Sequence, residues 1–269
     1  MPARLIALIV AILIVALLVL AGLALFMAHD KGRDSRSYRA VSAVVAPISR
    51  RLHHDTTSDI RTPYANPRGQ IEPEWRWLQR DAVEIEPRTD RLALIATRES
   101  LWFLNARGPL VYRQLVGDGT VSAVVKARKR SDPASPPDME WQFAGLLLRD
   151  PASDAWMSLE NYVFNVIGFC CGELQVETKS TRQGLSEIHS FRWDSGDAEL
   201  AIQRSGARFT LRARRVGSHD NRGDAWRELV SYDRPDLPAR LQVGLILYAH
   251  SQGRGRHDLR ADFEQIAVR

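Results

Sequence analysis

Cysteine is almost absent from this 269-residue chain: there are two, Cys170 and Cys171, and they are neighbours. A disulfide between adjacent cysteines is strained, so the pair identifies neither an oxidising nor a reducing compartment. No cysteine lies close in sequence to His250 and His257, which flank a turn rich in glycine and arginine. A zinc site needs three or four converging ligands. The sequence therefore predicts no metal centre and no cofactor.

The signatures of several common catalytic sites are missing as well. There is no Gly-x-Ser-x-Gly elbow, no glycine-rich phosphate loop and no His-Glu-x-x-His zinc helix. These absences favour a protein that is not an enzyme.

Long apolar runs are rare too, and the exception is the segment from Leu5 to Ala28, 24 residues without a polar side chain. At 1.5 Å per residue its helix would be about 36 Å long, enough to cross a hydrocarbon core of about 30 Å. A cleaved signal peptide is the alternative, but its apolar core is usually shorter, and Gly22-Leu23-Ala24 is a weak cleavage site. We expect residues 1–28 to be an uncleaved, single-pass transmembrane signal anchor.

Small residues four apart in this run allow close packing of membrane helices. The pairs are Ala7 with Ala11 and Ala24 with Ala28. They predict contact with an integral membrane partner, although such pairs also arise by chance in an alanine-rich anchor that faces lipid.

Basic charge is concentrated beside this run. Residues 29–80 contain ten basic and six acidic side chains, whereas residues 81–269 contain 26 of each. A nucleic-acid-binding domain would carry the surplus on its folded part, so we expect no nucleic-acid partner. A basic stalk over 29–70 suits anionic lipid headgroups instead.

The side of the membrane is ambiguous. Positive charge after the run favours a cytoplasmic domain, while the short N-terminal tail of a signal anchor favours export. We expect a bacterial-type cytoplasmic membrane with the C-terminal domain on the periplasmic side.

After the stalk, short runs rich in Val, Leu, Ile and aromatic residues recur every 8 to 14 residues. This rhythm is typical of an all-β domain. We predict eleven strands, over 91–96, 120–127, 142–149, 157–166, 173–179, 187–193, 199–203, 208–214, 226–231, 240–248 and 260–268. Strict alternation, as in Phe209, Leu211 and Ala213, marks strands with one buried face. Residues 71–269 are therefore expected to form a two-sheet antiparallel jelly-roll sandwich.

The order of several short motifs supports this fold. They are Trp75-x-Trp77, Arg91-Leu92-x-Leu94, Leu101-Trp102, Pro109-Leu110-x-Tyr112-Arg113, Ala144-Gly145-Leu146-Leu147-x-Arg149, Ile202-x-Arg204-x-Gly206-x-x-Phe209, Trp226, Leu241-x-Val243-Gly244-Leu245 and Ala261-Asp262-Phe263. In this order the chain resembles the concanavalin A-like lectin/glucanase superfamily. Within it, the chain is similar to the regulation-of-enolase-type domain of unknown function and to the C-terminal sandwich of β-xylosidases. The resemblance implies a fold more than an activity.

Glucanases of that superfamily carry alternating carboxylates on one strand, and the nearest match here is Glu173-x-Gln175-x-Glu177. Glu173 and Glu177 would lie about 13 Å apart on a strand, too far for the carboxyl pair of a glycosidase. Asp262 and Glu264 are closer but flank Phe263, as on an ordinary solvent face. A glycoside hydrolase with an unrecognised acid pair stays as the enzymatic alternative.

Calcium, which some members of the superfamily bind, is an unsupported alternative. Its candidate loops are Gly117-Asp118-Gly119 and Asp194-Ser195-Gly196-Asp197, which are more often plain hairpin turns.

Seven tryptophans remain, and most should be core because the indole is the largest apolar side chain. Trp156 is the exception, since it follows the polar turn Ser153-Asp154-Ala155. The predicted ligand-binding residues are Arg149, Trp156, Asn161, Tyr162, Trp102 and Arg113, with the alternative that Arg113 pairs with a buried carboxylate. We therefore expect a membrane-anchored, non-catalytic recognition or assembly module, either an accessory subunit of a membrane complex or a glycan-binding domain.

Overall fold

The computed structural model describes residues 75–88, 90–216, 225–250 and 257–269. The predicted anchor over 1–28 and the stalk over 29–70 lie outside these residues, as do Ala7, Ala11, Ala24 and Ala28. Among the residues described, none belongs to a helix of the length and apolar character needed to cross a membrane.

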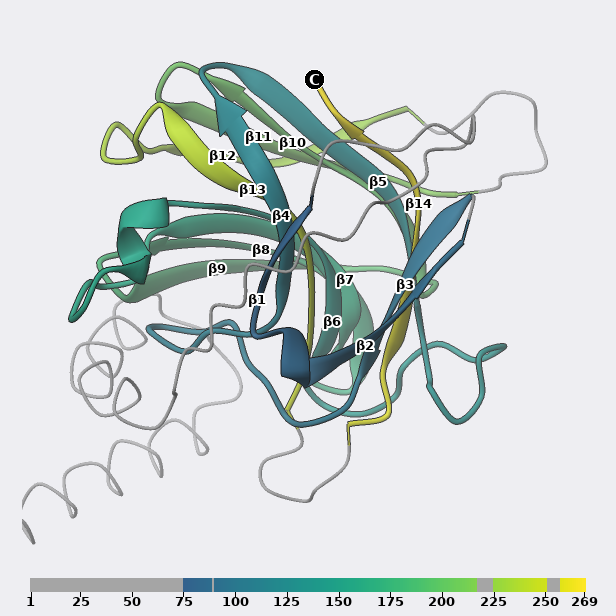
Figure 1. Ribbon diagram of the computed structural model, residues 1–269. Helices are drawn as coiled ribbons and strands as arrows, with labels where there is room; N and C mark the ends of the chain where they lie inside the picture. Colours follow the sequence, from purple (N-terminus) through teal and green to yellow (C-terminus); the bar gives the residue numbers. More distant parts are fainter. Residues whose placement is uncertain (1–74, 89, 217–224, 251–256) are drawn as a thin grey trace, which may run out of the picture.

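The described chain is all-β and contains two antiparallel sheets, as predicted, and each sheet has seven strands (Figure 1). The first sheet has the order β1 (Arg76–Leu78), β4 (Leu110–Val116), β13 (Arg240–Ala249), β6 (Gln142–Arg149), β7 (Tyr162–Cys170), β8 (Glu173–Arg182), β9 (Leu185–Arg192). The second has the order β12 (Arg227–Asp233), β11 (Arg208–Arg214), β10 (Asp197–Ser205), β5 (Gly119–Arg128), β14 (Arg260–Val268), β3 (Arg91–Ala96), β2 (Val83–Pro87). Two short 3-10 turns complete the elements, η2 (Arg80–Ala82) and η3 (Pro151–Asp154).

The predicted strands agree closely with the observed ones, and four of them, β3, β6, β11 and β14, have the predicted bounds. Three strands, β1, β2 and β4, were not predicted as strands. The strand expected from Met157 begins only at Tyr162, because the apolar residues before Tyr162 belong to an exposed loop. Apolar side chains on that loop imitate the start of a strand.

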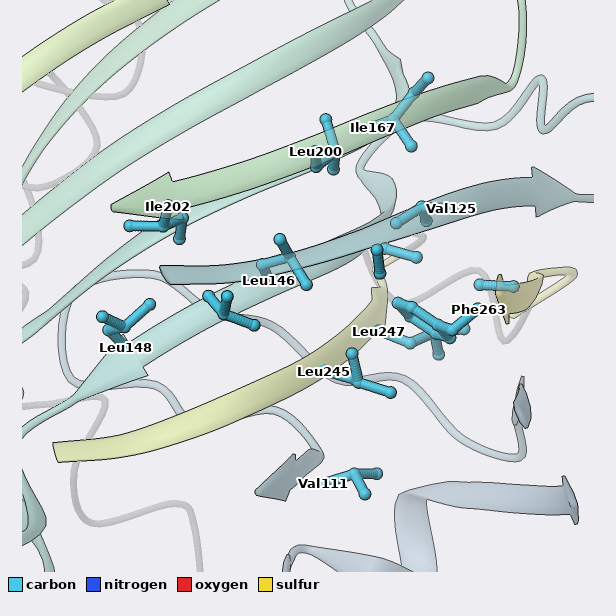
Figure 2. Packing of buried hydrophobic residues seen from close by; sticks show 14 of the residues in the cluster. Val111, Val125, Leu146, Leu148, Ile167, Leu200, Ile202, Leu245, Leu247 and Phe263 are labelled. Atoms are coloured by element: carbon cyan, nitrogen blue, oxygen red, sulfur yellow. The ribbon is translucent and has the colours of Figure 1, made fainter. Parts of the chain in front are cut away.

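The main core lies between the two sheets (Figure 2). Phe263 and Val125 of the second sheet meet Leu245 and Leu247 of the first there, and all four are fully buried. The alternation predicted for β11 is confirmed, because Phe209, Leu211 and Ala213 are buried while its arginines point away from this core. Burial of each large apolar side chain contributes about 1.5–3 kcal/mol, so this layer supplies most of the stability of the sandwich.

A second apolar cluster covers the outer face of the first sheet. Phe143, Tyr162, Phe164 and Tyr248 pack there with Trp102, which comes from the connection between β3 and β4. The Trp102 ring meets the Tyr162 ring edge-on, with 5.4 Å between centroids. The chain therefore covers part of this face with its own segment.

Candidate functional site

The candidate site is the loop that joins β6 to β7, and its base is Arg149, the last residue of β6. The loop opens with η3, where the Asp150 carboxylate accepts a hydrogen bond from the Ala152 amide at 2.8 Å. Pro151 stands at the first position of the turn, where no amide hydrogen is needed. In Figure 1 this turn projects as a teal coil at the edge of the molecule.

A buried polar network centres on Arg149, which is fully buried. Its Nε donates to Glu160 Oε2 at 2.7 Å, and a second guanidinium nitrogen donates to Glu160 Oε1 at 2.9 Å, a bidentate pair. A third nitrogen donates both to Asp154 Oδ1 and to Gln242 Oε1, each at 2.7 Å. The Gln242 amide closes the ring by donating to Asp154 Oδ2 at 3.0 Å.

Arg107 joins this network from the β3–β4 connection. Its Nε donates to Glu160 Oε1, and its guanidinium also donates to the Ser153 carbonyl. With Asp154 the network holds two guanidinium groups and two carboxylates, so its formal charge is zero. A balanced and fully hydrogen-bonded set is the arrangement in which buried charges are tolerated.

Burial acts differently on the two arginines. Burial lowers the pKa of the Arg149 guanidinium, but the charges and hydrogen bonds of Glu160 and Asp154 outweigh it, and the pKa is raised overall. Burial also lowers the pKa of Arg107, and there the attraction of Glu160 does not fully compensate. Arg149 is therefore the better-satisfied cation of the pair.

Further hydrogen bonds fix the end of the loop. The Ser153 hydroxyl donates to the Leu159 carbonyl and accepts from the Asn161 amide, at 3.1 and 3.2 Å. The Asn161 side-chain oxygen accepts from the Gln183 amide, in the β8–β9 turn, at 2.7 Å. The Glu160 amide donates to the Asn105 side chain at 3.0 Å. The loop is thus held from both ends and from two neighbouring connections.

Trp156 lies at the apex of this braced loop with 92% of its surface exposed, and Met157 beside it is 71% exposed. Met157 has a φ of 62°, a left-handed conformation that costs a non-glycine residue roughly 1–3 kcal/mol. Such a conformation persists only where the surroundings impose it. The structure therefore presents a large apolar side chain to solvent on a rigid base.

The other predicted ligand-binding residues are distributed around this loop. Arg149 is in the network beneath it, and Asn161 is half-buried at its end. Tyr162 and Trp102 are fully buried in the second apolar cluster, where they pack on each other and present no surface to a ligand. Arg113 is on β4, and its side chain faces the opposite sheet, where it donates to the Val268 carbonyl at 3.1 Å. Trp156 is the member of the set that is open to a ligand.

The two carboxylates of β8 differ in exposure. Glu173 is exposed at the start of the strand and pairs with Arg192 at 3.7 Å, whereas Glu177 is on the outer face of the first sheet beside the Trp102 segment. Glu177 is buried there beside Lys179, with 3.4 Å between Oε1 and Nζ. The Lys179 amine donates to the Trp102 carbonyl at 2.9 Å and lies 4.4 Å from the centre of the Phe164 ring. Burial lowers the pKa of Lys179, and Glu177 partly opposes this. Glu177 therefore forms an ion pair with Lys179 in a buried position, where a ligand does not reach it.

Each of the remaining acidic candidates already interacts with another residue of this protein, through an ion pair or a hydrogen bond. Asp262 and Glu264 pair with Arg260 and Lys126 at 3.0 and 2.7 Å, and Phe263 between them points into the core. Of the calcium candidates, Asp118 accepts from the Gly206 amide at 2.7 Å. Asp194 pairs with Arg215 at 2.8 Å, and Asp197 with Arg128 at 2.5 Å.

Sequence reasoning missed Glu160, Arg107 and Gln242, which complete the network. Glu160 stands two residues before β7, and Arg107 lies 53 positions earlier in an irregular segment. Neither position has a local pattern that would mark it. Their roles follow from tertiary contacts alone.

No family model matches the sequence, and no curated protein matches it. Solved structures do match the fold. A functionally unknown protein from Saccharomyces cerevisiae has a TM-score of 0.57 at 13% identity, with 72% of this chain and 95% of that chain covered. The fold also matches Xyloglucan PUL GH43B of Bacteroides ovatus, with a TM-score of 0.53 at 15% identity over 81% of this chain and 40% of that chain.

A mutant of the GH43 protein BlXynB from Bacillus licheniformis has a TM-score of 0.51 at 13% identity, over 71% of this chain and 36% of that chain. The chain thus spans less than half of both GH43 proteins. At these identities the likeness establishes the fold, and it is consistent with the lectin/glucanase type of β-sandwich that the motifs indicate.

Proposed function

We propose that this chain is a non-catalytic recognition module that binds a glycan through Trp156. The observation that carries the proposal is a tryptophan with 92% exposure on a loop braced by the Arg149 network. Trp156 is grouped with the exposed apolar side chains of Met157 and Leu159 on the same loop. A group of exposed apolar side chains, unlike a single one, marks a contact surface. The likeness in fold to two GH43 proteins, one of them Xyloglucan PUL GH43B, makes carbohydrate the first ligand class to test.

The geometry suits a sugar ring. A pyranose presents an apolar C–H face that stacks on an indole, and its hydroxyl groups need hydrogen-bonding partners at the rim. Asp154, which ends η3, and Asn161, at the end of the same loop, are partly exposed. Covering about 100 Å² of apolar surface contributes about 2.5 kcal/mol. This favours a weak but specific contact.

The buried state of the acidic groups supports a non-catalytic role. Glu160 is nearly inaccessible and is held by two arginines, and Glu177 is beneath the Trp102 segment beside Lys179. A glycosidase needs two carboxyl groups that reach the scissile bond from either side. In the described residues, neither of these carboxylates meets that need.

Replacing Trp156 with alanine should weaken glycan binding at least tenfold without changing the melting temperature, since the indole is exposed and supports no core. Titration of the full-length protein with a panel of xylan, xyloglucan and related oligosaccharides, followed by tryptophan fluorescence and calorimetry, measures this. Trp226→Ala is the matched control. Trp226 is also partly exposed, but it immediately precedes β12, a strand of the second sheet, and is not part of the Trp156 loop. Binding by no member of the panel would overturn the glycan proposal.

A protein ligand is the second candidate, because Met157 and Leu159 extend the exposed apolar surface beside Trp156. This version makes the chain an accessory subunit of a membrane complex. A pull-down in mild detergent would then recover a stoichiometric partner, and the Trp156→Ala protein would lose it. Migration as a free monomer would contradict the assembly version.

Tethering to the membrane is a further part of the proposal, resting on the apolar run from Leu5 to Ala28 and the basic residues after it. The full-length protein should remain in the membrane pellet after alkaline carbonate extraction. Protease added to intact spheroplasts should digest the domain if it is periplasmic. Release by carbonate would refute the anchor, and full protection in intact spheroplasts with digestion after their lysis would refute export.

A further inference from the structure

The turn between β7 and β8 brings three metal-binding side chains together. Cys170 ends β7 and is buried, Cys171 is the first residue of the turn and is exposed, and Glu140 comes from the connection before β6. The two sulfur atoms are 2.9 Å apart. The two thiols and the Glu140 carboxylate all lie within 4.8 Å of one another.

The turn itself holds these groups in place. Cys171 and Gly172 have φ values of 60° and 80°, as in a type I′ hairpin turn, where glycine, asparagine or aspartate is the usual first residue. The Glu140 carboxylate accepts from the Cys171 amide at 2.6 Å and from the Gly172 amide at 3.1 Å. The carboxylate is therefore fixed over the turn beside both thiols.

No lysine or arginine among the described residues forms an ion pair with Glu140, whereas Glu160, Asp154 and Glu264 all have such partners. A metal cation bound between the two sulfur atoms and the Glu140 carboxylate would supply the positive partner that this carboxylate lacks within the described ranges.

We infer that Glu140, Cys170 and Cys171 bind a thiophilic metal ion of the zinc and copper(I) class. Thiolate ligands select these ions over calcium and magnesium. In tetrahedral zinc coordination the ligand atoms are about 3.6–3.8 Å apart, so the two sulfur atoms need to separate by about 0.9 Å. The exposed Cys171 side chain can rotate to provide this. Three protein ligands leave the fourth position open to water or to another molecule.

This site is distinct from the proposed ligand-binding loop. Tyr162 and Cys170 are the two ends of β7, about 26 Å apart along a strand of nine residues. Failure of either proposal therefore leaves the other standing.

The test is titration of the reduced, full-length protein in detergent with Cd²⁺ alone, followed by the thiolate-to-cadmium absorption band in the ultraviolet. Because the chain has only two cysteines, any such band reports this turn. We expect saturation at one equivalent, displacement of Cd²⁺ by Zn²⁺, loss of the saturable band in Cys171→Ser and at least tenfold weaker binding in Glu140→Gln.

Glu173→Gln is the matched control, since Glu173 begins β8 next to the turn but is not one of the three clustered ligands. It should bind Cd²⁺ as the unaltered protein does. Three results would each overturn the inference: no band at one equivalent, equal affinity in Glu140→Gln and the unaltered protein, or no titratable thiol in protein isolated without oxidant. Circular dichroism of each variant confirms that the sandwich is intact.

Discussion

Replacing Arg149 with methionine is expected to lower the free energy of unfolding by about 3–5 kcal/mol, the usual effect of removing one partner of a buried ion pair. Arg149 is fully buried and bonds to Glu160, Asp154 and Gln242. Methionine fills much of the volume of the arginine side chain but donates no hydrogen bonds to these groups. Glu160 and Asp154 would then keep Arg107 alone as a cation within 4 Å.

Urea denaturation at neutral pH measures this loss, and a thermal scan should show a fall of roughly 6–20 °C. Arg98→Met is the matched control, since Arg98 pairs with Asp81 at 3.0 Å on the surface and each side chain is about half-exposed. Exposed pairs contribute about 0–1 kcal/mol. Equal effects of the two substitutions would show that the Arg149 network does not stabilise the domain.

The lysine variant at the same position separates charge from geometry. Arg149→Lys retains the positive charge but cannot form the bidentate pair with Glu160 and also reach Asp154 and Gln242. We expect it to recover only part of the lost stability. We also expect weaker ligand binding at Trp156, because the loop above the network would no longer be fixed.

The sequence predicted the strands well and the network poorly, and the physical reason is the range of the interactions. A strand with one buried face repeats every two residues, so β11 and β14 are visible in the local pattern. The contact between Arg107 and Glu160 joins residues 53 positions apart, and no local pattern marks it. Trp156 was identified because a polar turn precedes it, which is a local signal.

Tyr162 and Trp102 were predicted as ligand-binding residues from their sequence neighbours and motif order, and the structure buries both. The alternation of the strand places Tyr162 on the outer face of the first sheet, which the chain itself covers. Glu140 shows the same limit, since it reaches Cys171 across 31 positions of the chain. Side chains from irregular connections can be assigned only when the fold is known.

The domain is expected to unfold steeply above pH 10 because three buried tyrosines resist ionisation. Burial raises the pKa of Tyr162, Tyr232 and Tyr248 above the ordinary value of 10.0. Above pH 10 these groups lose protons in the unfolded chain and keep them in the folded one. The unfolded state then binds fewer protons, so the free energy of unfolding falls as pH rises.

The size of the effect follows from the number of groups. Each tyrosine removes about 1 kcal/mol between pH 10 and 11, because half of the unfolded-state groups are already ionised at pH 10, so three together remove about 3 kcal/mol. Lys179 has the opposite sign, because burial lowers the pKa of its amine below the ordinary 10.5. It favours the folded state as pH rises towards 10.5 and adds nothing beyond that value, where the tyrosines dominate.

Urea denaturation at pH 8, 9.5, 10.5 and 11, with tyrosinate absorbance at 295 nm recorded in parallel, tests this. The absorbance of these three residues should appear together with unfolding, and Tyr248→Phe should reduce the slope above pH 10 by about one third, since it removes one of three equivalent groups. Ionisation of all tyrosines near pH 10 in a protein that retains its β-sheet circular dichroism would contradict the prediction. That result would mean that water reaches the phenol groups of Tyr162 and Tyr248 on the outer face of the first sheet, which the Trp102 segment would then cover only transiently, and the phenol group of Tyr232 at the edge of the main core.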